Sequence, residues 1–135
     1  MKIESLLVVL SVIGLFSSLL ALRDYYSGTP VCRVDERWNC KSVYSIPEAE
    51  FLGIHLTFLA PIYFTVLTLL STIYLYTNME EAMLLFTILS VLGAVLVPYL
   101  VYLEARVAHA FCLYCTIMHV VILCLTVSSL YMHVR

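Results

Sequence analysis

Charged residues are scarce in this chain of 135 residues, where they make up 12% of the sequence against 63% hydrophobic residues. Soluble globular domains carry about 25% charged residues, so the composition excludes an ordinary soluble fold and indicates a membrane protein. The net charge is −2 and the sequence has no dense basic cluster, which argues against nucleic acid as a partner. The sequence also lacks internal repeats and low-complexity tracts. We expect one domain over residues 1–135.

Charge is missing altogether from four long stretches. They lie between Glu4 and Arg23, Glu50 and Glu80, Glu81 and Glu104, and Arg106 and Arg135. Each could span a hydrocarbon core of about 30 Å as a helix, so we predict an all-α integral membrane protein, a four-transmembrane-helix bundle with up-down topology. The predicted helices are residues 5–22, 53–76, 82–103 and 110–132. A retained first helix is favoured over a cleaved signal peptide, because its apolar run exceeds a normal signal core.

The loop between the first two helices, residues 23–52, is longer than a bundle requires, so we expect it to be functional. It carries Cys32 and Cys40, which seven residues separate. Near its end, Ser45-Ile46-Pro47-Glu48 matches a capping box with Ser45 as N-cap, and a proline is tolerated in the first turn. We therefore predict a short capping half-helix that starts at Ser45 and lies over the end of the bundle.

A C-x-x-C motif, Cys112-Leu113-Tyr114-Cys115, opens the fourth predicted helix. Its two sulfurs would share one helical turn, where the helix N-terminus favours a thiolate. Tracing the hairpins puts it on the same membrane face as Cys32 and Cys40. Three interpretations follow: a relay of two dithiol/disulfide pairs, two structural disulfides, or a zinc site with all four cysteines as ligands. The seven-residue spacing suits zinc poorly, and a disulfide within one helical turn constrains little.

Polar residues inside the predicted helices are further candidates. His119 lies one turn from Cys115 on the same face, and it is either a packed polar residue or a functional one. His55, Thr57 and Ser45 are weaker candidates of the same kind. Cys124 has no partner in the pattern, so we expect a buried cysteine that acts as a small hydrophobe.

Two local features complete the helical pattern. Gly14 with Ser11, Ser17 and Ser18 forms a small-residue face on the first helix, which we interpret as a packing surface. Residues 104–110 are expected to form a short loop before the fourth helix.

These residues in this order resemble the vitamin K epoxide reductase family. In that family a loop cysteine pair follows the first helix, and a C-x-x-C opens the fourth helix of a four-helix bundle. The matching positions here are Cys32-x7-Cys40, Val43, Gly53 and Cys112-Leu113-Tyr114-Cys115. The similarity covers nearly the whole chain.

The resemblance implies a quinone-dependent oxidoreductase that generates disulfides. A separate thioredoxin-like protein would reduce a Cys32–Cys40 disulfide, Cys40 would exchange with Cys112, and Cys115 would pass electrons to a membrane quinone of the ubiquinone or menaquinone type. No metal is expected. The quinone-binding candidates are His119, Ser45, His55, Thr57, Phe111 and Tyr114.

Three positions depart from the family pattern. Ile46 stands where members usually carry serine or threonine, with Ser45 just before it. Gly53-Ile54-His55 replaces the Gly-Ile-Pro of many microbial members, and His119 replaces a tyrosine of the vertebrate enzymes. These departures argue against a role in a vitamin K cycle.

The basic residues predict how the chain sits in the cell membrane. Arg23, Arg33, Arg37, Lys41 and Arg106 lie on the cysteine side, against Lys2 and Arg135 on the other. The positive-inside rule then makes the cysteine side cytoplasmic, whereas the family default is the exported side. Disulfide formation in the cytoplasm would suit a hyperthermophile.

Overall fold

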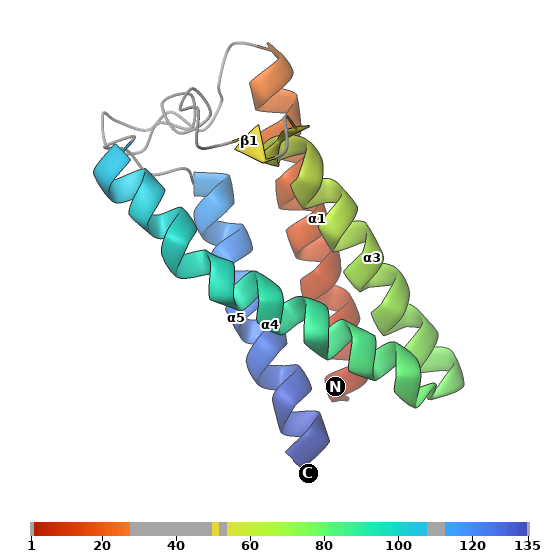
Figure 1. The fold of residues 1–135 in the computed structure, drawn as a ribbon. Coiled ribbons are helices and arrows are strands. Elements are labelled where there is room, and N and C mark those ends of the chain that lie inside the picture. The colour runs from red at the N-terminus through yellow and green to blue at the C-terminus, as the bar shows by residue number, and fades with distance from the viewer. Residues whose placement is uncertain (1, 28–49, 52–53, 108–112, 135) are drawn as a thin grey trace.

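The computed structural model describes residues 2–27, 50–51, 54–107 and 113–134 (Figure 1). In chain order its elements are α1 (Ile3–Ser27), β1 (Glu50–Phe51), β2 (Ile54–His55), α3 (Leu56–Thr77), α4 (Glu80–Tyr102), the π-helical turn η2 (Leu103–Val107) and α5 (Leu113–Val134).

The four long helices run up and down in one bundle (Figure 1). The main contacts join α1 to α3 and α5, and α4 to α3 and α5. We call the end where α1 and η2 finish and α3 and α5 begin the loop end. The opposite end, where both chain termini lie, is the terminal end. The turn between α3 and α4 lies at the terminal end, where Asn78 adopts the left-handed conformation (φ 55°) and donates its N–H to Tyr74 O at 2.8 Å.

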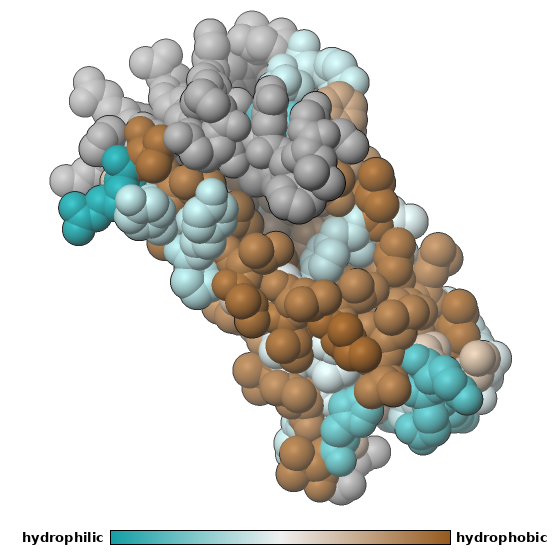
Figure 2. Space-filling view, in the orientation of Figure 1, coloured by the Kyte–Doolittle hydropathy of each residue, from teal (hydrophilic) through white to brown (hydrophobic). Residues whose placement is uncertain are grey.

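All four helices are long and apolar enough to cross a membrane. Their outward faces carry large apolar side chains, among them Phe16, Val95 and Val127, each more than 60% exposed. Figure 2 shows apolar residues covering the middle of the face in view, with hydrophilic residues towards its two ends. Because so much exposed apolar surface requires an apolar solvent, the predicted all-α membrane bundle is confirmed.

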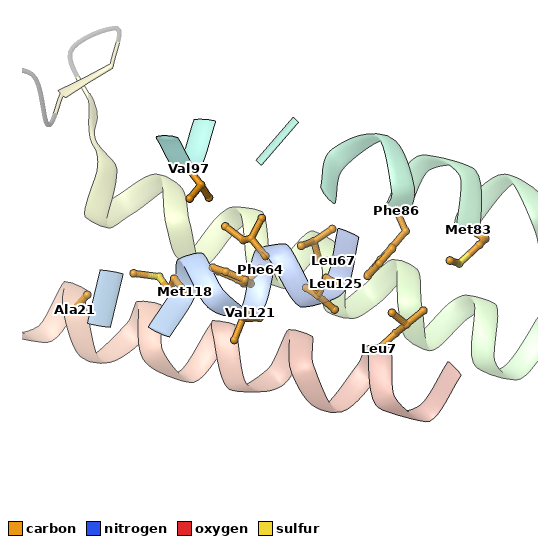
Figure 3. Packing of buried hydrophobic residues seen from close by; sticks show 11 residues of the cluster. Leu7, Ala21, Phe64, Leu67, Met83, Phe86, Val97, Met118, Val121 and Leu125 are labelled. Atoms are coloured by element: carbon orange, nitrogen blue, oxygen red, sulfur yellow. The ribbon is translucent and has the colours of Figure 1, made fainter. Parts of the chain in front are cut away.

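The core lies between the inward faces of the helices (Figure 3). Phe64, Leu67 and Leu125 occupy its middle and are at most 1% exposed. Ala21 and Met118 lie on one side of them, and Leu7, Met83 and Phe86 lie on the other. The core therefore extends along the length of the bundle.

The small-residue face of α1 is a packing surface, as predicted. Ser11, Ser17 and Ser18 are buried, and a Cβ placed at Gly14 would collide with the ring of Phe64 on α3. Glycine is required at this position because the aromatic ring occupies the space of a side chain. Close contact between α1 and α3 depends on it.

The helix ends differ from the prediction at several points. α1 extends to Ser27 instead of Leu22, because no residue after Leu22 breaks a helix before Gly28. α3 begins at Leu56 instead of Gly53, since β2 precedes it and His55 forms its N-cap. The short loop predicted for residues 104–110 is wrong in its first part, where the chain continues from α4 into η2. No proline or glycine stands there to end the helix.

The predicted capping half-helix is not confirmed. Most of it lies outside the described residues, but Glu50 and Phe51 are extended and pair antiparallel with Ile54 and His55. The register joins Glu50 to His55 and Phe51 to Ile54. The sequence offers a reason, because it carries Gly53 just before the second strand, and glycine favours a turn over a continuous helix.

Candidate functional site

The structure describes five of the ten predicted site residues. Cys115, His119, Tyr114, His55 and Thr57 lie in helices or caps at the loop end of the bundle. The other five lie outside the described residues: Cys32, Cys40, Cys112, Ser45 and Phe111. The meeting of the two cysteine pairs therefore remains a prediction from the sequence.

Cys115 lies in the first turn of α5, at the loop end. Its side chain and that of Tyr114 are partly buried and pack against the apolar core. Cys115 is therefore partly exposed at the loop end and partly in contact with the core. Because the first turn of a helix presents unpaired N–H groups, this position stabilises a thiolate.

His119 follows one turn deeper along α5, about 6 Å further along the helix axis. The ring is buried, with 8% of its surface exposed. Within the described part of the chain it makes no hydrogen bond to another residue. An imidazole nitrogen without a protein partner can form a hydrogen bond with a ligand or a water molecule. A functional role of His119 stays a prediction from the sequence.

His55 and Thr57 have a structural task at the start of α3. The Thr57 backbone N–H donates to His55 Nδ1 at 3.2 Å, and Thr57 Oγ1 lies 2.9 Å from the same nitrogen. Nδ1 accepts the N–H, so the neutral ring carries its proton on Nε2. His55 is therefore an N-cap, a role that the sequence did not reveal because histidine is not a common capping residue.

An aromatic cluster joins α1 to α3 at the loop end. The rings of Tyr25 and His55 are stacked with their centroids 4.2 Å apart and an angle of 21° between them. Phe58 meets Tyr25 and Tyr26 edge-on, at centroid distances of 6.2 and 5.4 Å. The extension of α1 to Ser27 brings both tyrosines to the start of α3. The cluster holds the cap of α3 against α1.

The π-helical turn η2 places a carboxyl group inside the loop end. Glu104 is only 3% exposed, although its neighbour Arg106 is exposed. A buried carboxyl group is rare unless it is paired, and π-helical turns occur often at functional sites. The sequence predicts a loop at Glu104 and gives no sign that the side chain is buried.

Cys124 corrects another expectation. It is exposed on α5 and not buried. It lies two and a half helical turns beyond Cys115, so the two side chains point to opposite sides of the helix. Cys124 consequently faces away from the site, towards lipid.

These features define a class of protein: a multi-pass membrane protein with a cysteine and a buried histidine one turn apart on one face of a membrane-spanning helix. A model of the vitamin K epoxide reductase family matches residues 5–130, and the chain belongs to that family. The match confirms the resemblance drawn from the cysteine pattern. No curated protein matches the chain in a sequence search. Family membership implies a membrane oxidoreductase linked to disulfide formation or to quinone.

Proposed function

We propose that this chain is a membrane oxidoreductase that oxidises a thioredoxin-like dithiol protein and reduces a membrane quinone. The two electrons would pass through Cys32 and Cys40 to Cys112 and Cys115. The observation that carries the proposal is that Cys115 and the buried His119 lie one turn apart on one face of α5, in a chain of this family. Cys32 and Cys40 would react with a protein at the membrane surface, and Cys112 and Cys115 would react with a lipid-soluble acceptor.

Each exchange follows thiol–disulfide chemistry. The partner dithiol becomes a disulfide and reduces the Cys32–Cys40 disulfide. The Cys40 thiolate then attacks Cys112 in a Cys112–Cys115 disulfide, which forms a Cys40–Cys112 bond and releases the Cys115 thiolate. Cys32 attacks Cys40 in turn, so that the outer disulfide is restored and Cys112 and Cys115 are both reduced. One electron pair has then moved inward.

The quinone, of the ubiquinone or menaquinone type, accepts this electron pair together with two protons. His119 would hold a quinone oxygen by a hydrogen bond, since its ring has no protein partner in the described part of α5 or its neighbours. Tyr114 and Phe111, which flank the cysteines, would border the ring. His55 and Thr57 are satisfied by each other in the cap, so they are second to His119 as partners for the quinone. Ser45 completes the proposed set.

Quinone reduction by the purified protein tests the proposal. Wild-type protein with dithiothreitol and a short-chain ubiquinone should form quinol, and Cys115→Ala should lower the rate to that without protein. Cys124→Ala is the matched control, because Cys124 faces away from the site. It should retain the wild-type rate within about twofold, as expected for an exposed substitution. A fully active Cys115→Ala variant would contradict the proposed path.

We also propose, from the distribution of basic residues, that the loop end faces the cytoplasm. The count is five basic residues on the loop side against two on the other. An impermeant thiol reagent should then label reduced Cys32 only after the cells are permeabilised. Labelling of Cys32 in intact cells would reverse the orientation, while the electron path would stay the same.

A further inference from the structure

Five polar side chains lie along the interface of α4 and α5, in the half of the bundle nearer the terminal end. We call them the α4–α5 polar seam: Thr87 and Ser90 on α4, and Thr126, Ser129 and His133 on α5. The three α5 residues continue a spacing of three and four residues that begins at Cys115 and includes His119 and Ile122. This spacing keeps all of them on one face of the helix.

Hydrogen bonds cross the interface within the seam. Thr126 Oγ1 lies 2.9 Å from Ser90 O on α4, and equally far from the carbonyl oxygen of Ile122 on its own helix. Thr87 Oγ1 donates to Met83 O, also at 2.9 Å, so it accepts from His133 Nε2, which is 2.9 Å away. His133 is exposed, which puts this end of the seam in reach of water at the terminal end.

Ser90 is the unsatisfied member of the seam. The residue is 1% exposed, and its Oγ has no hydrogen-bond partner within the described residues. Burying a hydroxyl group without a hydrogen bond is costly, and serine in a membrane helix normally bonds to a carbonyl one turn back. A bound water molecule between α4 and α5 would satisfy it.

Polar groups continue from Ser90 towards the loop end. Tyr63 on α3 donates its hydroxyl to Leu89 O at 2.8 Å, next to Ser90 in the sequence. The Tyr63 hydroxyl lies against Gly93, where Ile122 of α5 also packs. Ile122 is one turn from His119, so the Tyr63 hydroxyl lies between the level of Ser90 and that of His119.

These polar groups recur about once per helical turn, which advances about 5.4 Å along the axis. A water molecule that bonds to oxygen atoms on both sides, each at about 2.8 Å, spans a similar length. Single water molecules between successive groups would therefore complete a hydrogen-bonded line from His133 to His119.

We propose that the seam is a hydrated route that carries protons from the terminal face of the membrane to the quinone at His119. The inference rests on the proposed function. Oxidation of the partner dithiol releases two electrons and two protons at the loop end, and reduction of a quinone to a quinol takes up two of each. The electrons pass through the cysteines, whereas the protons enter from the opposite side. Each turnover would thus separate charge across the membrane.

Proton uptake in proteoliposomes tests the inference. The vesicles contain ubiquinone in the lipid, a trapped pH indicator, and valinomycin with potassium to prevent a membrane potential. The impermeant reductant tris(2-carboxyethyl)phosphine is added outside, so that only molecules with the loop end outward are reduced. We expect the vesicle interior to become alkaline by two protons for each quinol formed. Quinol formation with a constant internal pH would overturn the proposed proton route and leave the proposed function intact. Absence of quinol in these vesicles would overturn both.

Two variants locate the route. Ser90→Ala removes the unpaired hydroxyl, and His133→Phe removes the group nearest to water. Each should slow internal alkalinisation about fivefold or more, the factor that one lost hydrogen bond typically represents. Ser71→Ala is the matched control, because Ser71 is equally buried but bonds to Thr68 O within α3. It should stay within about twofold of wild type. Alkalinisation at the wild-type rate in both seam variants would contradict the route.

Discussion

The α1–α3 and α4–α5 interfaces use the same kinds of small polar residue in different ways. At the first, hydroxyl groups turn back to their own helix, as Ser11 does to Leu7 O and Ser71 to Thr68 O. At the second, two of them also meet the neighbouring helix, Thr126 at Ser90 O and Thr87 at His133 Nε2, and Ser90 Oγ has no partner within the described residues. Hydroxyl groups satisfied within one helix allow close packing and nothing more. Those that cross a helix pair create a polar path.

This difference assigns separate tasks to the two interfaces. The α1–α3 interface, with Gly14 against Phe64, holds the bundle together. The α4–α5 interface carries the proposed redox and proton chemistry along one face of α5, from Cys115 past His119 to His133. Variants of the first should change stability alone, and variants of the second should change turnover.

The largest effect is expected at Phe64, which is 1% exposed in the α1–α3 interface. Phe64→Ala should lower the free energy of unfolding by about 3 kcal/mol, because the cavity loses packing contacts that lipid cannot replace. Thermal unfolding in detergent measures this. Phe16→Ala is the control, since Phe16 is 64% exposed towards lipid. The rate of quinol formation per folded molecule should be unchanged in both variants. A much lower rate in Phe64→Ala would contradict the assignment of separate tasks to the two interfaces.

A smaller effect is expected at His119. His119→Phe removes the proposed hydrogen bond to the quinone and should raise the KM for quinone about tenfold, which corresponds to about 1.4 kcal/mol. His119→Gln keeps a donor and should recover part of that loss. Steady-state kinetics over a range of quinone concentrations gives both values. An unchanged KM in His119→Phe would remove His119 from the quinone site.

The smallest effect is expected for the threonine hydroxyl groups. Thr126→Val removes the hydrogen bond across the α4–α5 interface and should cost about 0.6 kcal/mol of stability, the average for such bonds in membrane proteins. Thr68→Val removes a bond within α3, to Phe64 O, and should cost less. Thermal unfolding of the two variants under one condition compares them directly. Equal losses would show that the crossing bond adds no stability of its own.

Much of the fold could be predicted from the sequence, because charged residues are so scarce. The four uncharged stretches must each cross the bilayer, and the short turn at Asn78 leaves α3 and α4 antiparallel. The cysteine spacing led to the family that the comparison confirms. These features are set by short stretches of the sequence and not by contacts between distant segments, so they can be predicted from the sequence.

The contacts between helices could not be predicted from the sequence in the same way. The stacking of Tyr25 on His55 requires α1 to run past its predicted end, and the burial of Glu104 depends on how η2 packs. The lack of a partner for Ser90 Oγ among the described residues depends on how α4 and α5 pack against each other. One signal was present nonetheless: the spacing of His119, Thr126 and His133 marks a polar face on an apolar helix, and it could have been read along with Cys115.

The central claim is that both cysteine pairs belong to one electron path, and a trapped disulfide tests it most directly. In the double variant Cys32→Ser, Cys115→Ser, neither end can resolve a bond between Cys40 and Cys112. After mild oxidation and alkylation, trypsin should release Trp38–Lys41 joined to Val107–Arg135, and reduction should separate the two peptides. Mass spectrometry, with Cys124→Ser added to exclude that cysteine, should find this cross-link as the main product. Recovery of alkylated Cys40 and alkylated Cys112 on separate peptides would contradict the relay.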